Sequence, residues 1–175
     1  MLCGLTGESL REHLPEKRNI VLTGMPGSGK STTGALLAGK LARPFFNLDA
    51  EAVRRAGMPV TEIFETRGEL FFRDLESEII REFSAGGGKV IATGGGSVLR
   101  KENVDALKQN GIIVFLDRPL AELLPSEDRP LANSTEKLRA LYEARYSLYV
   151  STADVVVPVR GTPESVTRAI LEKLV

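Results

Sequence analysis

The stretch NIVLTGMPGSGKS, residues 19–31, decides the fold. Its first five residues form a short apolar run, which predicts a buried strand. Gly24 to Ser31 then follow the pattern G-x-x-x-x-G-K-[ST], whose glycines let backbone N–H groups converge on a phosphate at the positive end of a helix. Lys30 is expected to neutralise the β- and γ-phosphates of a nucleoside triphosphate, and the Ser31 hydroxyl to ligand Mg²⁺. The predicted ATP-binding residues of this loop are Gly27, Ser28, Gly29, Lys30, Ser31 and Thr32.

Short apolar runs alternate with amphipathic segments along the rest of the chain. Strands are expected at 19–23, 44–48, 89–92, 112–116 and 155–159, and helices at 30–42, 49–56, 68–85, 102–110, 134–149 and from 162 to the C-terminus. This alternation predicts a parallel sheet covered on both faces. We therefore expect an α/β fold, a three-layer α/β/α sandwich with a five-stranded parallel sheet. Residues 19–175 are expected to form a single domain, and residues 1–18 an N-terminal extension with a short helix.

Composition excludes several classes of protein. Among 175 residues, 23 Lys and Arg balance 23 Asp and Glu, so the formal net charge is zero, which argues against a general nucleic-acid binder. A single Cys3 rules out an internal disulfide framework and a cysteine-based metal site, and a single His13 cannot make a histidine cluster. No apolar run approaches the roughly 18 residues of a membrane span. We expect a cytoplasmic monomer that contacts neither nucleic acid nor membrane.

The phosphate acceptor is indicated by residues beyond the loop. The chain has no Asn-Lys-x-Asp segment, which a GTPase of this size usually shows. Asp49 follows the second strand, where it either accepts a proton from an attacking hydroxyl or caps the next helix. Gly94, Gly95 and Gly96 follow the third strand and either form a loose turn or bring backbone amides close to a small ligand.

Three arginines are candidates for a positive pocket. Arg73 and Glu76 lie three residues apart on a helix and can touch, although such a pair is usually solvated. Arg129 and Arg145 stand beside prolines or tyrosines, and each taken alone is a typical surface residue. Together, the three could supply the charge that a carboxylated substrate and a transferring phosphoryl group need.

The segment Arg73 to Glu76, with Ile80 and the stretch VIATGGGSV at 90–98, resembles the signature of the shikimate kinase family. The resemblance covers residues 19–175 and includes Phe64 and the Arg-Pro-Leu at 129–131. It implies a P-loop kinase fold of the nucleoside monophosphate kinase type, with a mobile lid around residues 119–133, here called the lid segment. It also implies an ATP-dependent phosphotransferase with an alcohol acceptor, the 3-hydroxyl of shikimate, in the biosynthesis of chorismate and aromatic amino acids.

The resemblance also implies roles for individual residues. Asp49 is expected to hold the shikimate hydroxyls and to act as base. Arg73 and Arg145 are expected to bind the shikimate carboxylate, with Glu76 orienting Arg73. The remaining contacts implied by the family are backbone amides at Gly94, Gly95 and Gly96 for shikimate, Arg129 for the transferred charge, and Arg160 and Pro163 for adenine.

Three positions depart from the family pattern. Asn47 replaces the first acid of an Asp-x-Asp pair; it can still accept a hydrogen bond from a Mg²⁺-bound water but adds no charge, so we expect weaker Mg²⁺ binding. The part of the lid segment between Leu123 and Arg129 is short and lacks basic residues, which predicts more ATP hydrolysis without acceptor. Ser147 replaces a proline and removes a rigid element beside Arg145.

Two other functions fit part of the pattern. A related P-loop kinase for another small hydroxy acid or polyol would keep Lys30 and Asp49 but would not need Arg73 and Arg145. A catalytically relaxed nucleotide-binding protein would fit the loss of an acid at Asn47. The intact Lys30, Asp49 and Arg73 favour the shikimate kinase prediction over the relaxed protein.

Overall fold

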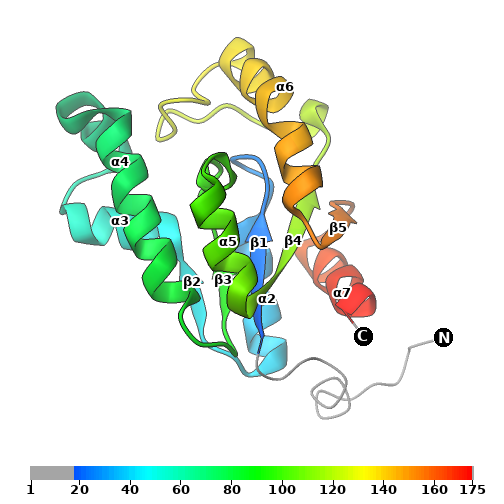
Figure 1. Cartoon of the computed structure of the whole chain (residues 1–175). Coiled ribbons are helices and arrows are strands. Elements are labelled where there is room, and N and C mark those ends of the chain that lie inside the picture. Colours follow the sequence, from blue (N-terminus) through cyan, green and yellow to red (C-terminus); the bar gives the residue numbers. More distant parts are fainter. Residues whose placement is uncertain (1–17, 175) are drawn as a thin grey trace.

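The computed structural model describes residues 18–174, so the predicted N-terminal helix and the single cysteine and histidine lie outside the described part. Five parallel strands form one sheet in the order β2-β3-β1-β4-β5 (Figure 1). Their bounds are β1 Asn19–Thr23, β2 Phe45–Asn47, β3 Val90–Ala92, β4 Gly111–Asp117 and β5 Val155–Pro158. The predicted five-stranded parallel sheet is confirmed.

Alternate residues of the strands face two separate cores. Ile20 and Leu22 of β1 pack with α2 (Lys30–Leu41) and α7 (Pro163–Leu174) on one face of the sheet. Val21, between them, packs on the other face with the remaining helices. These are α3 (Leu48–Ala56), α4 (Val60–Ser84), α5 (Lys101–Asn110) and α6 (Thr135–Thr152). Because both faces are covered, the strands are apolar apart from end residues such as Asn19, Thr23, Asn47 and Asp117, as the sequence indicated.

The prediction missed the first third of α4. The helix begins at Val60, directly after Pro59, whereas the sequence predicted a start at Gly68. Gly68 adopts φ 83°, outside the helical region, and kinks the element there. The expected helix is therefore only the longer, C-terminal part of a broken helix. Two short 3₁₀ helices, η1 (Ser97–Leu99) and η2 (Leu120–Glu122), complete the described elements.

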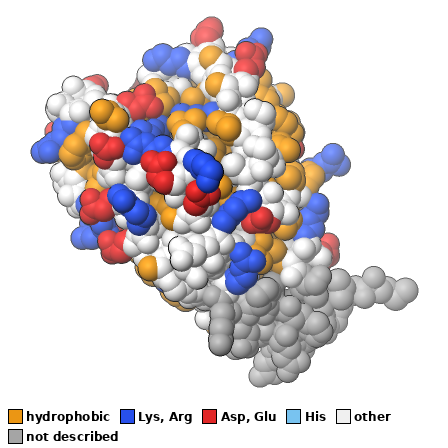
Figure 2. All heavy atoms as spheres, viewed as in Figure 1, with side chains coloured by type: hydrophobic (Ala, Val, Ile, Leu, Met, Phe, Trp, Pro, Cys, Tyr) orange, Lys and Arg blue, Asp and Glu red, His pale blue; other side chains and the backbone are white. Residues whose placement is uncertain are grey.

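The carboxyl ends of the strands meet at one edge of the sheet, beneath the space between α4 and α6 (Figure 1). On the face seen in Figure 2, basic and acidic side chains are interspersed, in keeping with the zero net charge. Among residues 18–174, no helix combines the length and the apolar character that a membrane span requires.

Candidate active site

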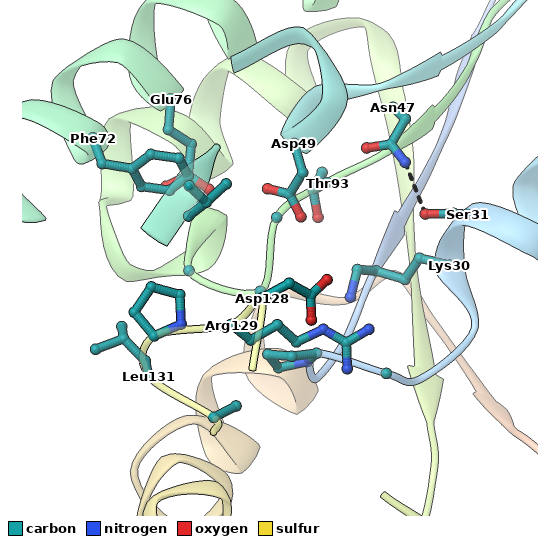
Figure 3. A pocket seen from close by; sticks show the side chains of 18 of the residues that line it. Lys30, Ser31, Asn47, Asp49, Phe72, Glu76, Thr93, Asp128, Arg129 and Leu131 are labelled. Atoms are coloured by element: carbon teal, nitrogen blue, oxygen red, sulfur yellow. Dashed lines mark hydrogen bonds between the residues drawn. The ribbon is translucent and has the colours of Figure 1, made fainter. Parts of the chain in front are cut away.

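A cavity of about 720 Å³ lies at the carboxyl edge of the sheet. Its walls come from the phosphate loop after β1, the β2–α3 junction, the kinked helix α4, the glycine loop after β3, the lid segment and α6. This volume lies within the usual range for small-molecule sites. Lys30, Asp49 and Arg129 point into this space from three separate elements (Figure 3). The cavity therefore joins the predicted nucleotide site to the predicted acceptor site.

The phosphate loop has the backbone that its glycines predicted. Gly27 and Gly29 adopt φ 80° and 95°, which favours glycine, and α2 starts at Lys30. Lys30 is buried, and its Nζ donates to the carbonyl oxygens of Gly24 at 2.8 Å and Met25 at 2.9 Å. Burial lowers the pKa of Lys30 to about 8, and Asp49 opposes that effect.

Most predicted residues of the loop line the cavity: Gly27, Gly29, Lys30, Ser31 and Thr32. Ser28 does not, because its side chain is buried and its backbone N–H donates to the Met25 carbonyl at 3.1 Å.

A side-chain hydrogen bond between Ser31 and Asn47 joins the end of the phosphate loop to β2 at the predicted metal position. Asn47 caps α3: its Oδ1 accepts a hydrogen bond from the Ala50 N–H at 3.2 Å. Its Nδ2 therefore faces Ser31 and donates to Oγ at 2.8 Å (Figure 3). No group of three or more His, Cys, Asp or Glu side chains gathers around a metal position within residues 18–174. A hydroxyl and an amide fit Mg²⁺, which is commonly held by one or two protein groups together with substrate phosphates and water.

Asp49 lies between the part of the cavity that the phosphate loop lines and the part that α4 and the glycine loop line. Partial loss of hydration inside the cavity raises the pKa of its carboxyl, while Lys30, Arg73 and Arg129 act in the opposite direction. The alternative that Asp49 caps the helix is wrong, because Asn47 provides the cap. The Asp49 carboxylate therefore takes no part in capping α3.

Arg73 is held by a buried ion pair. Its Nη1 donates to Glu76 Oε2 at 2.7 Å, and the other oxygen of Glu76 accepts from Ser97 Oγ at 2.8 Å. Arg100 donates to the Arg73 carbonyl at 3.2 Å. The predicted orienting contact of Glu76 is therefore present, and Ser97 and Arg100 were missed because they come from a different element.

The three glycines after β3 serve to make room for side chains. None of them has a positive φ. A Cβ at Gly94 would lie 2.6 Å from Asp49 Oδ1 and 2.6 Å from Glu76 Oε1, and a Cβ at Gly96 would overlap the Arg73 guanidinium. The glycine loop thus allows two carboxylates and an arginine to meet its backbone, so it is no loose turn.

The lid segment folds over the phosphate loop. Arg129 Nη1 lies 3.0 Å from the point where a Cβ of Gly27 would stand. Hydrogen bonds within the segment, from Ser126 N to Ala132 O and from Ala132 N to Arg129 O, hold its short loop together. Arg145 of α6 also lines the cavity and is only 5% exposed. The structure therefore brings both arginines to the cavity.

Arg160 and Pro163 are not among the residues that line this cavity. Arg160 lies in the exposed segment between β5 and α7, where Gly161 turns the chain at φ 74°, and exposed Pro163 is the first residue of α7.

Known proteins resemble the chain over most of its length. The family model for shikimate kinase matches residues 26–175. The chain belongs to the shikimate kinase family. A shikimate kinase of Clostridium beijerinckii is 44% identical over 145 residues, which cover 81% of this chain and 85% of the relative.

Solved shikimate kinases share the fold as well as the sequence. The structure from Acinetobacter baumannii, in complex with shikimate, has a TM-score of 0.84 and 34% identity over 89% of this chain and 92% of that one. The structure from Aquifex aeolicus has a TM-score of 0.79 and 38% identity over 89% and 95%. The expected P-loop kinase fold is confirmed.

Several residues of this cavity escaped the sequence prediction. Phe72, Thr93, Arg118 and Asp128 line the cavity. Arg118 comes directly after β4, and its Nη1 donates to the Gly27 carbonyl at 3.5 Å. The signal that could have found Arg118 is its position at the carboxyl end of a strand, where ligands bind in such sheets.

Proposed function

We propose that this protein transfers the γ-phosphate of ATP to the 3-hydroxyl of shikimate. The observation that carries the proposal is the place of Asp49. It is the one carboxylate among the predicted site residues that interacts with Lys30 of the phosphate loop and with Arg73 of the acceptor wall. A base that takes the proton of the attacking hydroxyl has to lie close to both the phosphate loop and the acceptor.

In this proposal the nucleotide lies against the phosphate loop. Amides of Gly27 and Gly29 point to the phosphates, with Lys30 and Thr32 beside them, and Arg129 covers them from the lid segment. Ser28 contributes through the fold of the loop and not from the cavity wall. Arg160 and Pro163 are proposed to contact the adenine outside the cavity.

The acceptor is proposed to lie between α4 and α6. The guanidinium groups of Arg73 and Arg145 both face the glycine loop, and such planar groups suit the carboxylate of shikimate. Backbone amides of Gly94, Gly95 and Gly96 are proposed to meet its hydroxyls. A relative that is 34% identical was solved with shikimate, which supports this choice of acceptor.

The chemistry follows from the charges around Asp49. The oxygen of the 3-hydroxyl forms a bond to the γ-phosphorus, the bond to the bridging oxygen of ADP breaks, and the hydroxyl proton passes to Asp49. A raised pKa makes the Asp49 carboxylate a stronger base. Lys30 and Arg129 stabilise the negative charge that shifts to the phosphates.

Mg²⁺ is the proposed cofactor, and it would neutralise phosphate charge when bound. Ser31 is proposed to hold it directly and Asn47 through water. The Asn47 carbonyl has one lone pair left for that water after it caps α3.

The cytoplasmic location and the monomeric state stay predictions of the sequence.

The test is an ADP-release assay with and without shikimate. The proposal expects strong stimulation by shikimate. Stimulation only by another hydroxy acid or polyol would make the protein a kinase for that acceptor. Nucleotide binding without any turnover would make it a relaxed nucleotide-binding protein.

Arg73→Lys tests the carboxylate clamp. Lysine keeps the charge but replaces the bidentate guanidinium of Arg73 with a point charge. It also replaces the guanidinium that donates to the Glu76 carboxylate. We expect the kcat/KM for shikimate to fall about 100-fold, the equivalent of about 2.7 kcal/mol. Normal turnover in this variant would refute the clamp. Arg139→Lys, an exposed arginine on α6 outside the cavity, is the matched control.

A further inference from the structure

All three tyrosines of the chain lie on α6, on either side of Arg145. Tyr142 and Tyr146 are partly exposed, whereas Tyr149 is fully buried. Their hydroxyls differ in what they contact, and this difference separates their roles.

The Tyr149 hydroxyl reaches the glycine loop. It donates a hydrogen bond to the Gly95 carbonyl oxygen at 2.5 Å, across 54 positions of sequence. Its ring stacks on Phe115 of β4 at 5.2 Å between centroids. Burial raises the pKa of Tyr149 to about 12, with Arg145 nearby acting in the opposite direction. The hydroxyl therefore stays protonated and remains a donor throughout the pH range of ordinary assays.

This hydrogen bond fixes the orientation of one peptide group. The described chain has no cis peptides, so the Gly96 N–H points opposite to the Gly95 carbonyl. Within residues 18–174, the Gly96 N–H makes no hydrogen bond to another protein group. With its carbonyl held by Tyr149, the peptide turns a free N–H away from the core. Gly96 lines the cavity, so this N–H is a donor for a ligand there.

The Tyr146 hydroxyl ties the same helix to the sheet. It donates to Asp117 Oδ2, at the end of β4, at 3.1 Å. Its ring contacts Phe115 edge-on at 5.8 Å. Arg145, next to Tyr146, is buried, and its Nη1 lies 3.5 Å from the place of a Cβ on Gly95. Two hydroxyls on one helix thus hold the backbone around Arg145 from two sides.

We propose that the hydroxyls of Tyr146 and Tyr149 are positioning groups for the acceptor half of the site: they fix Arg145 and the Gly95–Gly96 peptide in the places where shikimate is bound. The two hydroxyls hold the part of α6 where exposed Ser147 replaces the proline of the family pattern, and where the helix therefore lacks that rigid element beside Arg145. This inference rests on the proposed roles of Arg145 and of the glycine loop.

Three phenylalanine variants test it, because each removes one hydroxyl and keeps the ring. Tyr146→Phe and Tyr149→Phe are the test variants. Tyr142→Phe is the matched control, since the Tyr142 ring stacks on Tyr146 while its hydroxyl has no hydrogen-bond partner among the described residues. Steady-state kinetics give KM for shikimate and for ATP, and calorimetry gives the Kd of shikimate without nucleotide.

For Tyr149→Phe we expect shikimate KM and Kd to rise about tenfold, the effect of one hydrogen bond. For Tyr146→Phe we expect a rise of about three- to tenfold. The KM for ATP should change less than about twofold in both, and Tyr142→Phe should match the wild type. Thermal melting of each variant shows whether it is folded. If Tyr149→Phe does not fold, partly exposed Tyr146 decides the question.

Unchanged shikimate affinity in the folded test variants would overturn the inference, as would an equal loss of ATP and shikimate affinity. Arg145→Lys separates this failure from failure of the proposed function. If Arg145→Lys loses shikimate affinity while the phenylalanine variants keep it, the inference alone is wrong. If Arg145→Lys binds shikimate normally, the proposed clamp is wrong.

Discussion

Nucleotide binding should weaken above pH 8, because Lys30 loses its proton there in the ligand-free protein. Burial lowers the Lys30 pKa to about 8, and Arg129 and Arg145 add to the shift while Asp49 opposes it. Only the protonated amine attracts phosphate, and bound phosphate in turn favours the protonated amine. The phosphates of ADP are already ionised at these pH values, since their last pKa is about 6.

The size of the effect follows from the pKa. If binding requires protonated Lys30, the apparent Kd for ADP rises about twofold at pH 8 and about tenfold at pH 9, relative to pH 7. Calorimetric titration of ADP across this range measures the change, and repeating it in buffers of different ionisation heat measures proton uptake. A change below about twofold between pH 7 and pH 9 would refute the reasoning.

Two variants identify the titrating group. Lys30→Arg keeps its charge at every pH used, so its Kd should not depend on pH above 8. Asp49→Asn removes the group that raises the Lys30 pKa, so the pH above which ADP binding weakens should be lower in this variant. A pH dependence in Lys30→Arg equal to that of the wild type would assign the titration to another group.

The same shift has a consequence for stability. Below pH 8 the folded, ligand-free protein bears the full cost of a charged, buried Lys30, about 3 kcal/mol for a pKa lowered from 10.5 to about 8. This cost is relieved as the pH rises from about 8 to 10.5, where the unfolded chain still binds the proton. The free energy of unfolding should therefore rise over this range relative to Lys30→Met.

Three further perturbations have definite outcomes. Asn47→Asp places a carboxylate where the amide donates to Ser31, so the Mg²⁺ concentration that half-saturates Mg²⁺-dependent ADP binding should fall several-fold, and an unchanged value would contradict the role of Asn47. Gly94→Ala would push its Cβ against Asp49 and Glu76, which should raise shikimate KM at least about tenfold, whereas Gly39→Ala meets no atom within 4 Å and should bind normally. The short lid segment should allow measurable ATP hydrolysis without shikimate in a coupled assay, and a rate no greater than the assay blank would count against that expectation.

Local patterns predicted the parts of the site that lie within one stretch of sequence. The phosphate loop, the position of Asp49 after β2 and the contact of Arg73 with Glu76 each depend on residues a few positions apart. Backbone conformation and helix spacing decide such contacts, so the sequence indicates them directly.

The remaining features depend on residues that are distant in sequence. The orientation of the Asn47 amide follows from the cap of α3, and its partner Ser31 is 16 positions earlier. The Tyr149 hydrogen bond to Gly95 spans 54 positions and exists only because α6 packs on β4. The first third of α4 was missed for a local reason, because Pro59 and Gly68 both indicate a break and the short helix lies between them.

Identification of the product tests the central claim most directly. The protein is incubated with ATP, Mg²⁺ and shikimate, and the product is analysed by ³¹P–¹H correlation NMR. We expect one phosphorylated shikimate whose phosphorus couples to the ring proton on the carbon that bears the 3-hydroxyl, together with an equal amount of ADP. ADP formed without phosphorylated shikimate, or a phosphate on another hydroxyl, would contradict the arrangement of Asp49, Arg73 and Arg145 proposed above.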